Sequence, residues 1–512
     1  MTSATRAVVV SLLLLCSAGC VTASRQSAAN SIIRTAALSR DAAAGNILNQ
    51  TGAQFPKTWG TNDGKPVPAH YAMTTASETN AVSREAVAAG LKAIPSLSIT
   101  ADPDDLFSSE KGIYSHPQEH GDAWERPVSV EMFDAHGRST FRCGSGLRIH
   151  GGMSRRPEES PKHSFRLVFH DHHQFEKVAA EVTRRKIFHT PRNPPPHARL
   201  ARAPSRRVGG YDSLILRAGN NDSWLDSDGR FRPRATYIRD EWMRRSMADM
   251  GHPSARGVFV HLYLNGLYWG VYNLCEQPGP ALLAGEQTAA GFDIRKGDQM
   301  ESGDEVAWNK MMSLVNSSAG DERSYQEIGR YLDLPELADY LILNFYAGNS
   351  DWDRSANWFA LRPRTPGGRF QFTVWDAERT LGATDVATLD FDDDDSPPRL
   401  FQKLSENPAF RKLFAARAQR LLFDDGPLSP EKSAARFRAL ADALAPALTA
   451  ETARWGNYRR DVHRYKTGPF ESCTVEHDWQ PEVDHILTEY FPRRREVLLN
   501  QFRERGLFSP TN

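Results

Sequence analysis

Apolar and polar residues alternate along much of the first half of the chain, in a way that predicts β-strands. Val128, Val130 and Met132 alternate with polar residues before the turn sequence Asp-Ala-His-Gly, so we expect a strand that returns as a hairpin into "GLRIHGG". The run "GVFVHLYLNGLYWGVYNL" contains two alternating segments joined at Asn265-Gly266, and Asn-Gly is a favoured two-residue hairpin turn. "KHSFRLVF" and "YDSLILRAG" predict two further strands, the second of them buried.

Other segments follow the period of a helix. The stretch "ATYIRDEWMRRSMADMG" is amphipathic and stops at Gly251. "LPELADYLILNFYAGN" places Leu337, Leu341 and Phe345 on one stripe, and Gly348 ends it. From "NPAFRKLFAARAQRLLF" onward the pattern is mainly helical to the end of the chain. Strands early and helices late predict an α+β fold.

The first twenty residues have the pattern of an export signal. Arg6 supplies a positive start, "AVVVSLLLLC" an apolar stretch too short to span a membrane, and "SAGC" a small-residue cleavage site. The stretch resembles a bacterial lipoprotein signal with Cys20 as the lipidation site, and plain secretion after nearby cleavage is the alternative. Both interpretations place the mature chain outside the cytoplasm, as an outer-membrane or periplasmic lipoprotein or an extracellular protein. Residues 1–20 are then a signal peptide, and residues 21–90 a tether with a short helical segment.

Composition narrows the choice of partners. Hydrophobic residues make up 40% and charged residues 25% of the 512 residues, as in an ordinary globular protein with a sizeable core. Lys plus Arg equals Asp plus Glu, so the whole chain shows no bias toward nucleic acid or an anionic membrane. A basic loop over residues 184–207 has eight Lys and Arg and no acid. It would suit an acidic partner, but without interleaved aromatic residues nucleic acid is the least favoured one.

Two acidic segments raise the question of metal chemistry. "GNSDWDRSANWF" contains Asp351, Asp353 and Asn357, and "WDAERTLG" contains Asp376 and Glu378 on what the pattern predicts to be a strand. Carboxylates two apart on a strand point the same way, and with oxygen ligands from a nearby loop they would hold a divalent cation against phosphates. On spacing alone, an acid-rich turn with solvated side chains is the favoured interpretation.

Six segments in order resemble the CotH family of secreted, atypical kinases, over roughly residues 96–423. They are "GLRIHGGMSRRPEESPKHSFRLVF", "YDSLILRAGNNDSW", "YIRDEWMRRSMADMG", "FVHLYLNGLYWGVYNLCEQP", "GNSDWDRSANWF" and "WDAERTLG". The resemblance implies an atypical protein-kinase-like core, a mixed or antiparallel sheet with packed helices, over residues 91–424. Residues 425–512 would form a C-terminal helical extension. It also implies that ATP and Mg²⁺ or Mn²⁺ are used.

Site residues carry over by position in these segments. Asp351 matches the acid of the family's catalytic loop, and Asn357 the Asn that faces the metal. Asp376 matches the first acid of the motif "WDxD" and would hold the metal. Glu378 replaces the second Asp of that motif, and its longer side chain leaves open whether it touches the metal directly. Asp353 is an extra acid close by, either a second metal ligand or a turn residue, and we favour the turn residue.

The nucleotide side of the site is predicted less directly. Lys162 stands at the head of a strand where the family carries a lysine, and Arg166 points to the same face. In protein kinases a strand lysine contacts phosphates and pairs with an acid, for which Glu276 is the candidate. Lys296 in "DIRKGD" is a second candidate that the sequence does not rank against Lys162, and Arg217 would reach phosphates or brace neighbouring carboxylates.

Together these features predict a secreted or envelope-anchored kinase. It would transfer the γ-phosphoryl group of ATP to a protein or other hydroxyl substrate outside the cytoplasm, with a possible membrane anchor at Cys20 and no nucleic-acid partner. The alternative is a catalytically inactive, kinase-like module that binds a partner or builds part of the envelope or coat. A metal-dependent nuclease is disfavoured, because Thr380 stands where a lysine two residues after Glu378 would be needed.

Overall fold

We analysed a computed structural model of the chain, which describes residues 50, 52, 55–62, 65–74, 82–169, 213–283, 291–353, 357–464 and 467–508. The predicted export signal with Cys20 and the basic loop at residues 184–207 lie outside this part of the chain. The described residues form β-sheets as well as many helices, so the predicted α+β class is confirmed.

Seven strands close into a barrel in the order β3-β4-β5-β6-β7-β9-β8. They are β3 (Ser96–Ala101), β4 (Arg126–Phe133), β5 (Ser139–His150), β6 (Ser164–Val168), β7 (Ser213–Arg217), β8 (Gly257–Leu264) and β9 (Leu267–Glu276). Neighbours pair antiparallel except β3 and β8, which are parallel. The alternating residues of each strand supply the barrel interior, with Ile99, Val130, Leu147, Phe165 and Leu216 buried in one cluster. The predicted hairpin between β8 and β9 is confirmed, and both Asn265 and Gly266 adopt positive φ.

A second sheet lies beside the barrel. Its strands, in the order β11-β10-β12-β13, are β10 (Phe292–Lys296), β11 (Gln299–Ser302), β12 (Trp358–Pro363) and β13 (Gln371–Val374), and all pairs are antiparallel. A separate hairpin joins β1 (Thr58–Asn62) and β2 (Lys65–Pro68). Ile294 and Phe359 of the four-stranded sheet share a buried cluster with Ile215 and Cys275 of the barrel. This face of the sheet therefore packs on the outside of the barrel.

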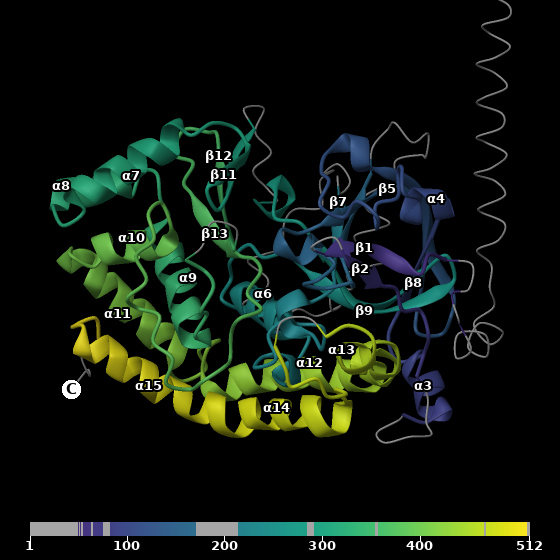
Figure 1. Cartoon of the computed structure of the whole chain (residues 1–512). Helices are drawn as coiled ribbons and strands as arrows, with labels where there is room; N and C mark the ends of the chain where they lie inside the picture. The colour runs from purple at the N-terminus through teal and green to yellow at the C-terminus, as the bar shows by residue number, and fades with distance from the viewer. Residues whose placement is uncertain are drawn as a thin grey trace, which may run out of the picture.

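Helices cover the remainder of the four-stranded sheet and run beneath the barrel (Figure 1). They are α3 (Arg84–Gly90), α4 (Pro103–Phe107), α6 (Arg239–Asp249), α7 (Val306–Ser318), α8 (Glu322–Ile328), α9 (Leu334–Ala347), α10 (Pro397–Leu404), α11 (Pro408–Leu422), α12 (Pro430–Glu451), α13 (Tyr458–Asp461), α14 (Gln480–His485) and α15 (Phe491–Glu504). Single helical turns of 3-10 type lie at Asp122–Trp124, Met153–Arg155, Asn220–Asp222, Arg232–Arg234 and Pro280–Leu283, and of π type at Thr452–Gly456, Val475–Trp479 and Ile486–Tyr490. Within the described residues, no helix combines the length and apolar character needed to cross a bilayer.

The helix α9 shows why local sequence predicts its ends well. The Asp333 side chain caps the start of the helix by accepting a hydrogen bond from the Glu336 amide at 3.2 Å. Gly348 ends the helix with φ of +57°. Nearly all of α9 is buried, because α6, α10, α11, α15 and β13 pack around it. One apolar core joins Trp242 of α6, Phe345 of α9 and Phe437 of α12. The helices after residue 424 therefore complete the core around α9.

Candidate functional site

The loop after α9 and the turn after β13 lie against each other. Ser350 donates its amide hydrogen to the carbonyl oxygen of Arg379 at 3.0 Å, and Leu381 donates to Ala347 at 2.8 Å. The two acidic segments found in the sequence are thus hydrogen-bonded neighbours. They meet where the four-stranded sheet approaches the barrel.

The alternating pattern predicts Asp376 and Glu378 on a strand, but in the structure both lie beyond the end of the strand. β13 ends at Val374, and Asp376 adopts a left-handed backbone with φ of +57° at the start of a turn. A left-handed residue other than glycine carries a backbone cost, which Asp bears better than most. The turn is held by Ala377, whose amide donates to Asp240 Oδ1 at 3.0 Å. The predicted strand "RFQFTVWDAE" therefore extends four residues too far, to Glu378, because the tertiary contact with α6 bends the chain after Val374.

Arg217 gathers the carboxylates of this turn. It lies at the end of β7 with only 7% of its side chain exposed, and it forms an ion pair with Asp376. The same guanidinium contacts Glu378 Oε1 at 2.8 Å and Asp240 Oδ2 at 3.3 Å. Its Cζ lies 4.9 Å from the centre of the Trp375 ring. One buried cation therefore faces three carboxylates from two elements, which leaves an excess of negative charge.

The two acids of the turn differ in their surroundings. Asp376 is 39% exposed, whereas Glu378 is 8% exposed. Glu378 also accepts the Asn221 amide through Oε2 at 2.8 Å, so both of its oxygens are bonded. Burial raises the pKa of Glu378 to about 7, with Arg217 opposing the shift and Asp376 adding to it. Asp376 is thus the carboxylate open to a ligand, and Glu378 the one committed to the protein.

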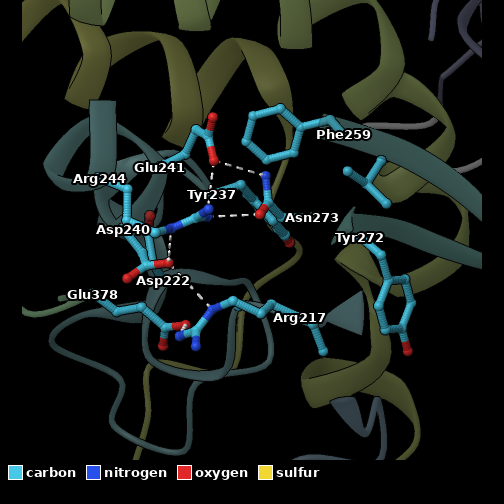
Figure 2. Close-up of a pocket in the computed structure, with 13 residues that line it drawn as sticks. Arg217, Asp222, Tyr237, Asp240, Glu241, Arg244, Phe259, Tyr272, Asn273 and Glu378 are labelled. Carbon is cyan, nitrogen blue, oxygen red and sulfur yellow. Dashed lines mark hydrogen bonds and ion pairs between the residues drawn. The ribbon is translucent and has the colours of Figure 1, made fainter. Parts of the chain in front are cut away.

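A pocket lined mainly by polar side chains and partly open to solvent lies beside Arg217 (Figure 2). Arg244 contacts Asp240 Oδ2 at 3.0 Å, Glu241 Oε2 at 2.8 Å and the Asn273 side-chain oxygen at 2.7 Å. Burial alone would raise the pKa of Asp240, but Arg217 and Arg244 together lower it. Sequence reasoning missed this network, since nothing in the pattern of α6 distinguishes its buried charges from solvated ones.

Lys162 is sealed inside the protein, with 1% of its side chain exposed. Its Nζ lies 2.6 Å from Glu451 Oε1 and donates to the carbonyl oxygen of Val271 at 2.7 Å. The predicted pairing with Glu276 is wrong, because Glu276 lies at the far end of β9 and forms an ion pair with Arg256. The partner comes instead from the last residue of α12.

A glycine makes this pairing possible. Gly270 has φ of +126°, and a Cβ there would lie 2.7 Å from Glu451 Oε2. The Glu451 carboxylate occupies the space that a side chain at residue 270 would fill. It also accepts a hydrogen bond from the Val271 amide at 2.6 Å. A helix far along the chain thereby reaches the strand that carries the predicted phosphate-binding lysine.

The remaining predicted residues have clear positions. Asn357 directly precedes β12, and its side-chain nitrogen donates to the backbone oxygen of Asp351 at 2.5 Å, closing the loop on itself. Arg166 lies on β6 opposite Ile215 of β7, on the outer face of the barrel. Asp353 lies in the same loop as Asp351.

Among the described residues, no group of three or more His, Cys, Asp or Glu side chains is arranged to hold a metal ion. The donor set is nevertheless of the right kind, since carboxylate and amide oxygens are the ligands of Mg²⁺ and Mn²⁺. Asp351, Asn357 and Asp376 would supply these oxygens. Both carboxylate oxygens of Glu378 already accept hydrogen bonds within the protein. The roles of these residues in catalysis and metal binding stay predictions.

Comparison with known families finds a match. The profile of the family described as "CotH kinase protein" matches residues 147–498. The matched region runs from within β5 to within α15, so it contains Arg217, both acidic segments and most of the C-terminal helices. A search among curated proteins finds no similar sequence.

Proposed function

The chain belongs to the CotH kinase family and is therefore kinase-like, and from this we propose that it is an active phosphotransferase. It transfers the γ-phosphoryl group of ATP to the hydroxyl group of a protein or other substrate, with Mg²⁺ or Mn²⁺ as cofactor. The substrate and the enzyme meet outside the cytoplasm, with the chain secreted or anchored to the envelope through Cys20.

One observation carries this proposal. The loop of Asp351 and Asn357 leads directly into β12, and the hairpin partner β13 leads directly out to Asp376. In protein kinases the catalytic loop with its Asp and Asn likewise precedes the acid that holds the metal. The hydrogen bond between Ser350 and Arg379 keeps the two segments adjacent. Residues with the chemistry of phosphoryl transfer are thereby brought to one place.

The roles follow from exposure and chemistry. Asp351 accepts the proton of the substrate hydroxyl as its oxygen attacks the γ-phosphorus, and the bond from that phosphorus to the bridging oxygen of ADP breaks. Asp376 and Asn357 would hold the metal, which neutralises charge on the β- and γ-phosphates when bound. Glu378 and Asp240 fix Arg217, and Arg217 in turn holds the Asp376 turn in position.

Thermal stabilisation by nucleotide tests the proposal. ATP with Mg²⁺ or Mn²⁺ should raise the Tm of the wild-type chain, and Asp376→Ala should abolish that shift by removing a metal ligand. Asp351→Ala should retain the shift and lose turnover of ³²P-labelled ATP into an acceptor by about 10²-fold or more. The Asp353→Ala variant is the matched control, since it removes an acid from the same loop and should keep both properties.

The contact of Arg217 with Asp376 and Glu378 is what favours the alternative, an inactive kinase-like binding module. In such a module Arg217 would permanently neutralise the acids that otherwise face a metal. Stabilisation that is absent, or that is indifferent to both Asp376→Ala and Asp351→Ala, would support this second function and overturn the first.

A further inference from the structure

Helix α9 ends in a turn that leads directly into the loop that carries Asp351. Gly348 adopts a left-handed backbone with φ of +57°, and its amide donates to the carbonyl oxygen of Phe345 at 3.1 Å. The next amide, that of Asn349, donates to the carbonyl oxygen of Asn344 at 3.0 Å. The chain therefore leaves the helix in a fixed direction, and Asp351 follows two residues after Asn349.

Two buried side-chain amides connect this loop to α9. Asn344 and Asn349 are 1% and 2% exposed, and Asn349 Nδ2 donates to Asn344 Oδ1 at 2.9 Å. Asn344 Nδ2 donates in turn to the carbonyl oxygen of Tyr340, one helical turn back, at 2.9 Å. Because this second bond fixes the Asn344 side chain, its oxygen stays directed at Asn349. Asn349 is thus bound to one residue of α9 through both its backbone and its side chain.

The side-chain oxygen of Asn349 holds the predicted catalytic acid. Asn349 Oδ1 accepts a hydrogen bond from the Asp351 amide at 3.2 Å, which forms an Asx turn. The carbonyl oxygen of Asp351 accepts a hydrogen bond from the Asn357 side chain. Both polar groups of the Asp351 backbone are therefore bonded to asparagine side chains, and these bonds fix the point from which the Asp351 carboxylate extends.

The residue after Asp351 adds an apolar contact with the same helix. Trp352 is fully buried and meets the Phe345 ring edge-on, with ring centres 5.4 Å apart. Its ring centre lies 6.0 Å from that of Tyr340. Helix α9 therefore holds the loop on both sides of Asp351, through Asn349 before it and Trp352 after it.

We propose that Asn344 and Asn349 are positioning residues for phosphoryl transfer, which hold the Asp351 backbone where its carboxylate meets the substrate hydroxyl. This inference rests on the proposed function, in which Asp351 accepts the hydroxyl proton. A displacement of about 1 Å can cost about 10²-fold in rate. Loss of the pair should therefore lower kcat and leave nucleotide binding intact.

Steady-state kinetics of the full chain test this role. Asn349→Ala should lower kcat and kcat/KM by the same factor, about tenfold, because it displaces a group that acts in the transition state. The KM for ATP should change by less than about twofold. Asn349→Ser keeps an oxygen that can accept the Asp351 amide, so it should retain about half of the wild-type kcat. Asn344→Ala should lower kcat in the same way, since it removes the anchor of Asn349.

Asn407 provides the matched control. It is a buried asparagine, 1% exposed, whose side chain accepts backbone amides at the start of α11. Asn407→Ala should lower the Tm because a helix cap is lost, and it should leave kcat unchanged. A fall in kcat for Asn407→Ala as large as that for Asn349→Ala would mean that activity follows stability, and the positioning role would be overturned.

A second background separates positioning of Asp351 from a general structural role. In the Asp351→Ala variant no carboxylate remains to be positioned. Adding Asn349→Ala to it should therefore reduce the residual turnover no further. A further loss of about tenfold in the double variant would show that Asn349 acts independently of Asp351 and would contradict the proposal.

Hydrogen exchange of the Asp351 amide provides a measurement that needs neither nucleotide nor turnover. Asn349→Ala and Asn344→Ala should each speed this exchange about fivefold, the size of one ordinary hydrogen bond. Unchanged exchange would overturn the contact. Faster exchange with a wild-type kcat would overturn the positioning role and leave the kinase proposal standing. A wild-type chain without turnover would overturn the kinase proposal and, with it, the catalytic role of the pair.

Discussion

Two buried cations, Lys162 and Arg217, are neutralised in different ways. Lys162 faces one carboxylate, Glu451, and the pair is 1% and 0% exposed. Arg217 faces three carboxylates, and one of them, Asp376, is 39% exposed. The Tyr272 ring lies 4.9 Å from Lys162 Nζ and also lines the pocket beside Arg217.

The difference indicates which centre is structural and which can work on a ligand. A sealed pair of one cation and one anion is balanced and has no opening, so its contribution is to fix α12 against β9. An unbalanced centre with an exposed carboxylate still has a position that a cation or a polar ligand can take. Shifted pKa values are frequent at functional sites, but structural ion pairs shift pKa values too. Here the two centres differ in solvent exposure and in the balance of positive and negative charge.

The largest effect is expected from breaking the sealed pair. Glu451→Ala leaves the Lys162 ammonium buried without its anion and also removes the acceptor of the Val271 amide. The free energy of unfolding should fall by about 3–5 kcal/mol, the usual cost of leaving one buried charge unpaired. Urea denaturation of the wild type and the variant measures this directly.

A double substitution shows whether charge or shape is responsible. Lys162→Met with Glu451→Gln removes both charges and keeps an oxygen for the Val271 amide. It should regain at least half of the stability that Glu451→Ala loses, because replacing a buried pair is far cheaper than breaking it. A loss below about 1 kcal/mol for Glu451→Ala would mean that water reaches Lys162, and the contrast between the two centres would fail.

A smaller, pH-dependent effect is expected at the open centre. The folded-state pKa of Glu378 is raised to about 7 from an ordinary value of 4.5. Between these values the folded protein binds a proton that the unfolded chain has released. The stability from this residue is therefore fully present below pH 4.5 and is lost as pH rises through 7. Glutamine does not titrate, so Glu378→Gln should gain on the wild type by about 1–3 kcal/mol between pH 5 and pH 8.

This comparison needs metal-free protein, so the unfolding curves are taken in EDTA. The lost hydrogen bond to Arg217 or Asn221 shifts the variant by a constant amount, and the change with pH is the quantity that matters. Glu110→Gln, at an exposed glutamate, is the matched control and should follow the wild-type curve. Parallel curves for Glu378→Gln would show that Glu378 is not held in an environment that disfavours its charge.

Local features of the sequence predicted local structure well. The caps Asp333 and Gly348 mark the ends of α9, and Asn265-Gly266 marks the hairpin of β8 and β9, since each effect is contained within a few residues. The acidic loop and turn were found for the same reason, and the family match covers both.

Long-range partners were not predictable in this way. Lys162 and Glu451 are separated by 289 positions, and Arg217 and Asp376 by 159. Alternation identifies the face on which a charge lies but not the element that packs on that face. The sequence suggests Glu276 as the partner of Lys162 because it follows the aromatic hairpin, whereas the actual acid, Glu451, comes from α12 and lies against Gly270.

The smallest effect is expected at an exposed ion pair, although its contact is shorter than that of the sealed pair. Arg230 Nη2 lies 2.5 Å from Asp228 Oδ2, whereas Lys162 Nζ lies 2.6 Å from Glu451 Oε1. However, 80% of the Arg230 side chain is exposed. Water and salt screen such a pair, so Arg230→Ala should barely change the free energy of unfolding, and should change it even less in 1 M NaCl. Denaturation at two salt concentrations measures both the change in the free energy of unfolding and its dependence on salt. A loss as large as that of Glu451→Ala would mean that contact distance outweighs burial, and the sealed and open centres could then no longer be ranked by their exposure.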